Sequence, residues 1–158
     1  MLLRDVLAVK GSEIFSVAPE ALVTEAIGMM VSRNIGSLVV FEEARKVAGI
    51  ITERDVMRAA HKHACDLTRL KVKDLMTTRL IQGGPEDTVD HTRSIMTENR
   101  IRHLPVMLGD ELLGLVTFHD VARAVLEQTN FENQLLKKYI KDWPEENTET
   151  SSVTNEES

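Results

Sequence analysis

The hydrophobic pattern of the first half predicts a helix flanked by strands. Between residues 23 and 31, apolar side chains recur at positions i, i+3, i+4, i+7 and i+8, the spacing of a helix with one buried face. Two apolar runs on either side of a polar stretch predict strands joined by a hairpin loop. The predicted order is helix, strand, helix, strand, strand, helix, over residues 2–9, 14–17, 23–31, 38–41, 47–51 and about 53–63.

The second half of the chain repeats this pattern. Gly-Ile-Ile-Thr-Glu-Arg-Asp at 49–55 returns as Gly-Leu-Val-Thr-Phe-His-Asp at 114–120, and two earlier landmarks return at an offset of 66. An offset kept by several separate landmarks indicates an internal duplication. Thr88 suits the N-cap of the long helix in this half. The elements predicted here cover residues 71–76, 80–82, 88–99, 103–108, 112–116 and 118 to beyond 126.

Each half is too small to bury its apolar surface alone, so the two halves should pack sheet to sheet about a pseudo-twofold axis. The predicted fold class is α/β, with two pseudo-symmetric β-α-β-β-α repeats at residues 1–66 and 67–127. A separate amphipathic helix is expected at 128–143, where Leu135, Leu136, Tyr139 and Ile140 have helical spacing. Pro144 should end it, and the acidic stretch 144–158 should be disordered.

Charge and cysteine content narrow the classes of function. The net charge is −6, but five glutamates between Pro144 and Ser158 carry most of it, so the folded part is nearly neutral. A strongly basic nucleic-acid surface is therefore not expected. The single cysteine, Cys65, allows no internal disulfide and fits a reducing compartment. Neither a signal-peptide core nor an apolar run long enough to cross a membrane is present in the sequence, so a cytoplasmic protein without membrane contact is expected.

The duplicated Thr-x-x-Asp motif is the main candidate for chemistry. Thr52 and Asp55, and again Thr117 and Asp120, follow an apolar strand and begin a helix. Each pair could simply be a capping box that satisfies free helix N–H groups. The alternative is a ribonucleotide site, because a helix N-terminus attracts phosphate and an Asp carboxylate can accept hydrogen bonds from both ribose hydroxyls.

With these motifs the chain resembles a tandem CBS (cystathionine-β-synthase-type) domain pair, or Bateman module, of the stand-alone kind. The segments Ile35 to Val40 and Ile101 to Val106 add to the likeness, which covers roughly residues 1–127. The resemblance implies a regulatory site for AMP, ADP, ATP, NAD(H) or S-adenosylmethionine between the repeats. It also implies that the Asp of one repeat meets an adenine pocket formed by the other, so that Asp120 pairs with Ile35, Gly36 and Ser37, and Asp55 with Ile101, Arg102 and His103.

The two sites are not expected to be equal. Arg102 and His103 occupy the positions that Gly36 and Ser37 occupy in the first repeat. If they face phosphates beside the threonine of their own repeat, the site at Asp120 gains cations and becomes the better nucleotide site. The residues before each Asp, Arg54 and His119, are secondary candidates for ligand contact, or else solvated residues of a first helical turn.

The residues favour a non-catalytic regulatory module over two alternatives. A ligand-independent dimerisation scaffold is the second hypothesis, and a small nucleotide-acting enzyme is the third. The family commonly forms homodimers through the repeat helices, and an apolar face including Met29 and Met30 could serve here. An unidentified effector protein on a separate chain is the expected partner. No catalytic cofactor is expected, and His61 and His63 lack the further ligands of a metal site.

Overall fold

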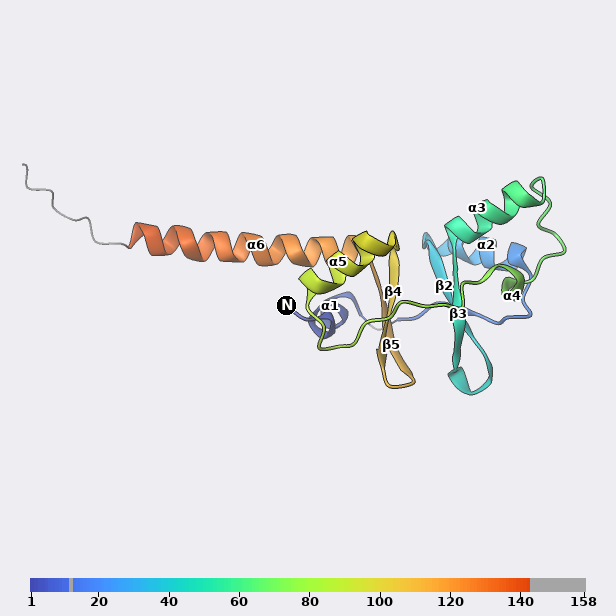
Figure 1. Cartoon of the computed structure of the whole chain (residues 1–158), viewed down its shortest axis with the longest axis horizontal. Coiled ribbons are helices and arrows are strands. Elements are labelled where there is room, and N and C mark those ends of the chain that lie inside the picture. Colours follow the sequence, from blue (N-terminus) through green and yellow to red (C-terminus); the bar gives the residue numbers. More distant parts are fainter. Residues whose placement is uncertain (12, 143–158) are drawn as a thin grey trace, which may run out of the picture.

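Two small sheets lie at the centre of the molecule, and helices cover their outer sides (Figure 1). The computed structural model describes residues 1–11 and 13–142. The first half contains α1 (Leu3–Lys10), β1 (Ser16–Val17), α2 (Val23–Arg33), β2 (Ser37–Phe41), the short 3-10 helix η1 (Glu43–Arg45), β3 (Val47–Thr52) and α3 (Glu53–Lys62). The second half contains α4 (Val72–Leu75), α5 (Val89–Asn99), β4 (His103–Leu108), β5 (Glu111–Thr117) and α6 (Phe118–Lys141).

The two sheets have matching strand arrangements. In the first sheet β1 runs parallel to β2, and β2 runs antiparallel to β3. In the second sheet β4 and β5 form the corresponding antiparallel pair. Ser37 and His103, which are equivalent under the repeat offset of 66, meet across the sheets with Oγ and Nδ1 3.0 Å apart. This contact between equivalent residues marks the pseudo-twofold relation, and the predicted fold class is confirmed.

One predicted strand, at 80–82, does not form. Only an isolated parallel bridge between Gly83 and Val106 remains at its end. In the first half, the N–H of Val39 donates to the carbonyl of Phe15 (3.1 Å) as the chain enters β1. Pro105 stands at the position of Val39 under the offset of 66 and has no N–H to donate. The second sheet therefore has two strands, where the first has three.

The opening helices cross between the halves. The side chains of Leu3, Val6 and Leu7 on α1 belong to the core of the second half, together with Val89 and Leu104. The reverse holds for Val72 of α4, which packs into the core of the first half with Ala26, Met30, Leu38, Val40 and Ile51. Two backbone hydrogen bonds fasten the helices in the same way: Leu3 N–H donates to Asp87 (2.9 Å) and Val72 N–H to Ala21 (2.8 Å). The core of the second half thus depends on α1 from the first half, and the core of the first half depends on α4 from the second half.

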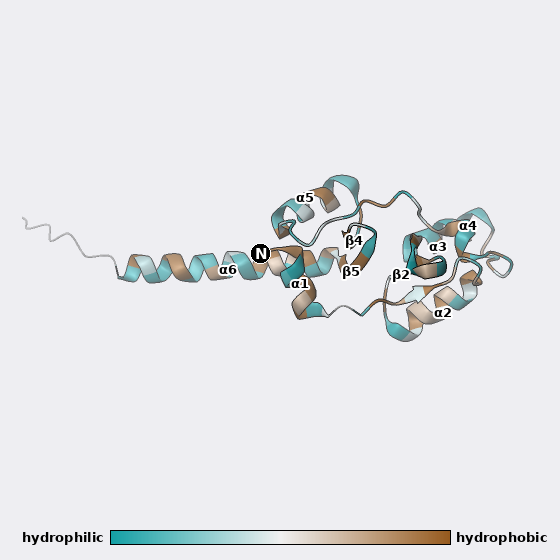
Figure 2. Cartoon of the chain, turned by 90° about the horizontal axis from the view of Figure 1, so that it is seen from below, coloured by the Kyte–Doolittle hydropathy of each residue, from teal (hydrophilic) through white to brown (hydrophobic). Residues whose placement is uncertain are grey.

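The C-terminal helix is longer and simpler than predicted. A break near residue 127 was expected, but α6 runs without interruption over 24 residues from Phe118 to Lys141. The reason is local, since neither glycine nor proline occurs between these residues. Its first turns bury Val121 and Ala124, whereas its later turns extend away from the body (Figures 1 and 2). The predicted end at Trp143 and the acidic stretch 144–158 lie outside the described residues.

One further prediction about helix faces needs correction. On α2 the buried residues are Val23, Ala26 and Met30, whereas Val31 is 75% exposed. The buried stripe is narrower than the apolar pattern, and Met30 is not available for a dimer face. On α5 a threonine replaces Ala26 of the first repeat, and this Thr92 is buried because its hydroxyl donates to the carbonyl of Thr88 (2.8 Å).

Candidate functional site

A cavity of about 280 Å³ opens where the two halves meet. This volume is near the lower end of small-molecule pockets, which starts at about 300 Å³. The start of α3, the segment after α4 and the connection between α5 and β4 form its walls. The lining residues are Gly36, Ile50, Thr52, Glu53, Arg54, Asp55, Arg58, Thr77, Arg79, Leu80, Ile81, Asn99, Arg100, Ile101, Arg102, His103 and Pro105.

A capping box holds Asp55 in the first turn of α3. The Asp55 N–H donates to Thr52 Oγ1 (3.3 Å), and the Thr52 N–H donates to Asp55 Oδ2 (2.9 Å). The Thr77 hydroxyl approaches the other carboxylate oxygen, Oδ1, at 3.3 Å. The two expectations for this motif therefore coexist, because Thr52 and Asp55 cap the helix and also line the cavity. A carboxylate placed in this way still has acceptor capacity for a ligand.

Arginines dominate the charge of this cavity. Five of them line it, against the two carboxylates of Glu53 and Asp55. They come from separate segments: Arg54 and Arg58 from α3, Arg79 from the loop after α4, and Arg100 and Arg102 from the connection into β4. Arg100 ends α5 in the left-handed conformation (φ 54°). Guanidinium groups that converge in this way favour polyanions such as phosphate chains.

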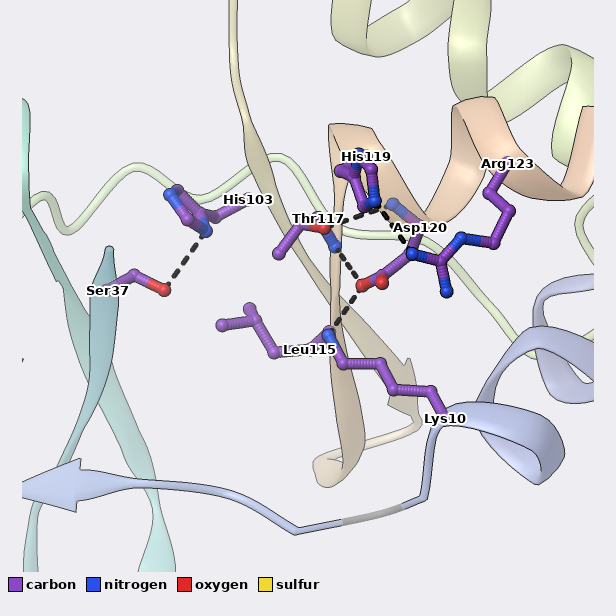
Figure 3. Close-up of polar contacts among 8 residues, drawn as sticks. All are labelled: Lys10, Ser37, His103, Leu115, Thr117, His119, Asp120 and Arg123. Atoms are coloured by element: carbon purple, nitrogen blue, oxygen red, sulfur yellow. Dashed lines mark hydrogen bonds and ion pairs between the residues drawn. The ribbon is translucent and has the colours of Figure 1, made fainter. Parts of the chain in front are cut away.

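The pseudo-symmetric position around Asp120 has a different composition. Under the repeat offsets, the five arginines correspond to His119, Arg123, Glu13, Asn34 and Gly36. His119 and Arg123 also contact each other, with Nε2 and Nη2 2.8 Å apart (Figure 3). The duplication is therefore preserved in the fold but not in the charge of the two sites.

A lysine from α1 neutralises Asp120. Lys10 Nζ donates to Asp120 Oδ2 (2.5 Å) and to the carbonyl of Leu115 (2.8 Å), and the Thr117 N–H donates to the same carboxylate (2.9 Å; Figure 3). Burial alone would raise the pKa of Asp120, but the hydrogen bonds from Lys10 and from Thr117 hold that pKa below its ordinary value. The Asp120 carboxylate, which the resemblance implies would bind a ribose, is thus already paired with the Lys10 ammonium.

The Ser37–His103 contact lies between the two Asp residues. Burial lowers the pKa of the His103 imidazole, with a smaller opposing effect from Glu53. The ring is therefore neutral at pH 7 and can share one hydrogen bond with the nearly buried Ser37 hydroxyl. This hydrogen bond joins β2 of the first sheet to β4 of the second.

The cavity brings together seven of the twelve residues predicted from sequence. They are Thr52, Arg54, Asp55, Gly36, Ile101, Arg102 and His103. The other five, Thr117, Asp120, His119, Ile35 and Ser37, are not among its lining residues. The sequence reasoning missed Arg58, Thr77, Arg79 and Arg100. Arg58 follows Asp55 by three residues on α3 and could have been found by helical spacing, but the others carry no local signal.

The expected ranking of the two sites stays a prediction, although its two cationic residues line the cavity at Asp55. Arg102 and His103 were expected to serve the threonine of their own repeat, Thr117. They instead line the cavity with Thr52 and Asp55 of the other repeat. The Arg102 carbonyl accepts a hydrogen bond from Phe118 N–H (2.8 Å), and the same residue lines the cavity. The cationic residues therefore line the cavity that Asp55 also lines.

The Lys10–Asp120 pair predicts a pH-dependent stability. Because the pKa of Asp120 is below its ordinary 3.8, the pair stabilises the fold above that pH and loses its effect as pH falls through the lowered pKa. We expect Lys10→Met to lower the free energy of unfolding at neutral pH, and the difference from wild type to shrink below about pH 4. Urea unfolding over a pH series measures this.

Arg4→Ala is the matched control on the same helix. It removes the exposed Arg4–Glu86 pair, whose side chains are 59% and 68% exposed, and should change the unfolding free energy by no more than about 0.5 kcal/mol. A Lys10→Met difference that stays constant down to about pH 2 would contradict the assignment of the effect to the Asp120 carboxylate.

The described residues contain neither a membrane-spanning helix nor a cluster of metal-ligating side chains. No helix within residues 1–142 is both long and apolar enough to cross a membrane. In the same part of the chain, no three His, Cys, Asp or Glu side chains converge as metal ligands.

Comparison with known proteins agrees with the geometry. The family model described as "CBS domain" matches residues 4–62 and 72–127. The chain is 40% identical to the mitochondrial CBS domain-containing protein CBSX3 of Arabidopsis thaliana. The 122 aligned residues cover 75% of this chain and 59% of that protein. The chain spans 59% and 31% of the lengths of the first two curated relatives it matches.

Solved structures give the same result. The CBS-domain containing protein ATU1752 from Agrobacterium tumefaciens superposes with a TM-score of 0.76 at 31% identity, over 78% of this chain and 98% of that chain. The CBS domain pair of protein MJ0100, solved in complex with 5'-methylthioadenosine and S-adenosyl-L-methionine, gives 0.70 at 25% identity, over 79% of this chain and 99% of that chain. With two repeats matched by the family model and this fold, the chain belongs to the CBS domain family as a tandem pair.

Proposed function

We propose that this chain is a non-catalytic regulatory module that binds one phosphorylated adenosine nucleotide in the cavity beside Asp55. The observation that carries the proposal is the convergence of five arginines on a cavity that also holds Asp55 at a helix N-terminus. The arginines and the start of α3 would bind phosphates, and the Asp55 carboxylate would accept hydrogen bonds from ribose hydroxyls. Ile101 and His103 would bound the adenine.

The charge of the cavity favours some adenosine compounds over others. The MJ0100 pair binds 5'-methylthioadenosine and S-adenosylmethionine, which carry no phosphate. Here five guanidinium groups outnumber two carboxylates, so a ligand without negative charge would leave the cations repelling one another. ATP and ADP, and NAD(H) with its diphosphate, fit this balance better. At the pseudo-symmetric position, the ion pair between Lys10 and Asp120 leaves this carboxylate less available to a ribose. This favours one nucleotide per chain.

Isothermal titration of the purified protein tests the ligand class. We expect the affinity to fall in the order ATP, ADP, AMP, adenosine, and S-adenosylmethionine to bind at least about tenfold more weakly than ATP, since one charge-assisted hydrogen bond is worth about 1.5 kcal/mol. Affinity for ATP should also fall as salt is raised, while adenosine affinity should change little. Tighter binding of S-adenosylmethionine than of ATP would contradict the proposal.

A second function, a ligand-independent scaffold, stays open. Exposed apolar residues on the outer helices support a homodimer through the repeats, with Val31 (75% exposed) and Met57 (72% exposed) in place of the buried Met30. Met57→Asp should then weaken this association through the repeats in sedimentation without changing ATP affinity. If no adenosine compound binds but the dimer forms, the scaffold hypothesis is favoured.

The effector protein and the compartment also remain proposals. We propose that nucleotide binding shifts the relative position of the two halves and that a partner protein binds one arrangement better than the other. A ligand can shift such an equilibrium only by its difference in affinity for the two states. The cytoplasmic location predicted from the single cysteine stays a prediction, because the Arabidopsis relative is described as mitochondrial.

A further inference from the structure

The later turns of α6 present apolar side chains to solvent. Every residue from Thr129 to Lys141 is exposed, over about 20 Å of helix at 1.5 Å per residue. Phe131, Leu135, Leu136 and Ile140 are 61%, 51%, 57% and 64% exposed. Figure 2 shows apolar positions recurring along this extension, beyond the reach of the body. Phe131 and Leu135 are four residues apart and share one face of the helix, and exposed apolar side chains on one face of a projecting helix are typical of a docking surface.

The charge pattern of this segment indicates what covers it. Its first part carries Glu127 and Glu132, and its second part carries Lys137, Lys138, Lys141 and Asp142, so three cations outnumber one carboxylate there. A copy of the same helix placed antiparallel brings the acidic part of one chain beside the basic part of the other. A parallel copy brings lysines beside lysines and glutamates beside glutamates, which costs binding energy. The segment is therefore complementary to itself in one direction only.

The length of the extension fits the same arrangement. With Leu135 opposite Leu135 of a second copy, Gln128 lies opposite Asp142, and Glu127 lies within one turn of Lys141. The overlap begins where the helix leaves the body, next to the contact of the N-terminal amine with Gln128 (3.2 Å), and ends where α6 ends. Because α6 projects away from the body (Figure 1), an antiparallel pair would place the two bodies at opposite ends of the paired helices.

We propose that two copies of this chain associate through the C-terminal halves of their α6 helices, antiparallel and centred on Leu135. The interface would bury Phe131 and Leu135 in the seam, with Leu136 along one side. It lies away from the cavity at Asp55 and from the exposed residues of α2 and α3, so it does not depend on the proposed nucleotide site.

Disulfide cross-linking tests the direction of pairing. In the full chain with Cys65→Ser, Leu135→Cys should self-link, while Gln128→Cys and Asp142→Cys should each fail alone and link when mixed. Asn133→Cys, on the opposite face of the helix, is the matched control and should not link. Self-linking of Gln128→Cys alone and of Asp142→Cys alone would mean parallel pairing, and no linking in any variant would mean that no such pair forms. Either result overturns the proposal.

Sedimentation of the full chain tests the strength of pairing. Leu135→Asp would place a carboxylate without a partner in the seam and should raise the dissociation constant at least tenfold, a change of about 1.4 kcal/mol. Asn133→Asp adds the same charge outside the seam and should leave the constant within a factor of about three. Both positions are exposed in the single chain, so neither change should disturb its folding. Equal dissociation constants for the two variants would overturn the proposal.

Discussion

Replacing Asp55 by asparagine should weaken ATP binding roughly thirtyfold, because charge-assisted hydrogen bonds worth about 2 kcal/mol would be lost. The same change at Asp120 should leave ATP affinity within about a factor of three, since Lys10 already occupies that carboxylate. Titration calorimetry of both variants measures the contrast.

Asparagine is the better probe than alanine because Asp55 also caps α3. Asparagine keeps an oxygen that can accept from the Thr52 N–H, whereas alanine would remove this half of the capping box at a cost of about 1 kcal/mol. A thermal melt of each variant without ligand separates loss of binding from loss of folding. The assignment of the site to Asp55 would be abandoned if Asp120→Asn weakened binding as much as Asp55→Asn.

Gly49→Ala should lower the free energy of unfolding by about 1 to 3 kcal/mol, the cost of overpacking. A Cβ atom at Gly49 would lie 2.6 Å from the carbonyl oxygen of Thr77, which is backbone and cannot rotate away. At this point the chain leaving α4 pairs with β3 through Ile50 N–H to Thr77 (3.0 Å) and Thr77 N–H to Ile50 (2.8 Å). Displacing this segment would also move the Thr77 hydroxyl away from Asp55, so ATP affinity should fall.

Gly28→Ala is the matched control for this change. Gly28 lies within α2, and a Cβ atom there would have no neighbour within 4 Å. The substitution should raise the free energy of unfolding by about 0.5 to 1 kcal/mol, because alanine is the better helix former. Both variants lose the same glycine freedom in the unfolded chain, so urea unfolding compares their folded states directly. Equal stability of the two variants would show that the contact with Thr77 relaxes at no cost.

Local features of this molecule could be predicted because neighbouring residues produce them. Thr88 caps α5 with its hydroxyl accepting from His91 N–H (3.2 Å), and Thr117 begins α6, both at the predicted positions. The strand predicted at 80–82 failed because its partner strand carries Pro105, a residue distant in sequence. Local pattern could not foresee this, since a strand needs donors from the chain that pairs with it.

The amino-acid sequence by itself determined the duplication, the order of the elements, the two capped helix starts and membership of the CBS family, because these depend on periodicity and on residues close together in the chain. Only the tertiary structure decided which aspartate faces the arginines. Arg79, Arg100 and Arg102 line the same cavity as Asp55 from segments more than twenty residues away, and Lys10 reaches Asp120 from a helix 110 residues away in the chain. Their meeting depends on the exchange of α1 and α4 between the halves, a packing event that buries Leu3 and Val72 and that no local pattern encodes.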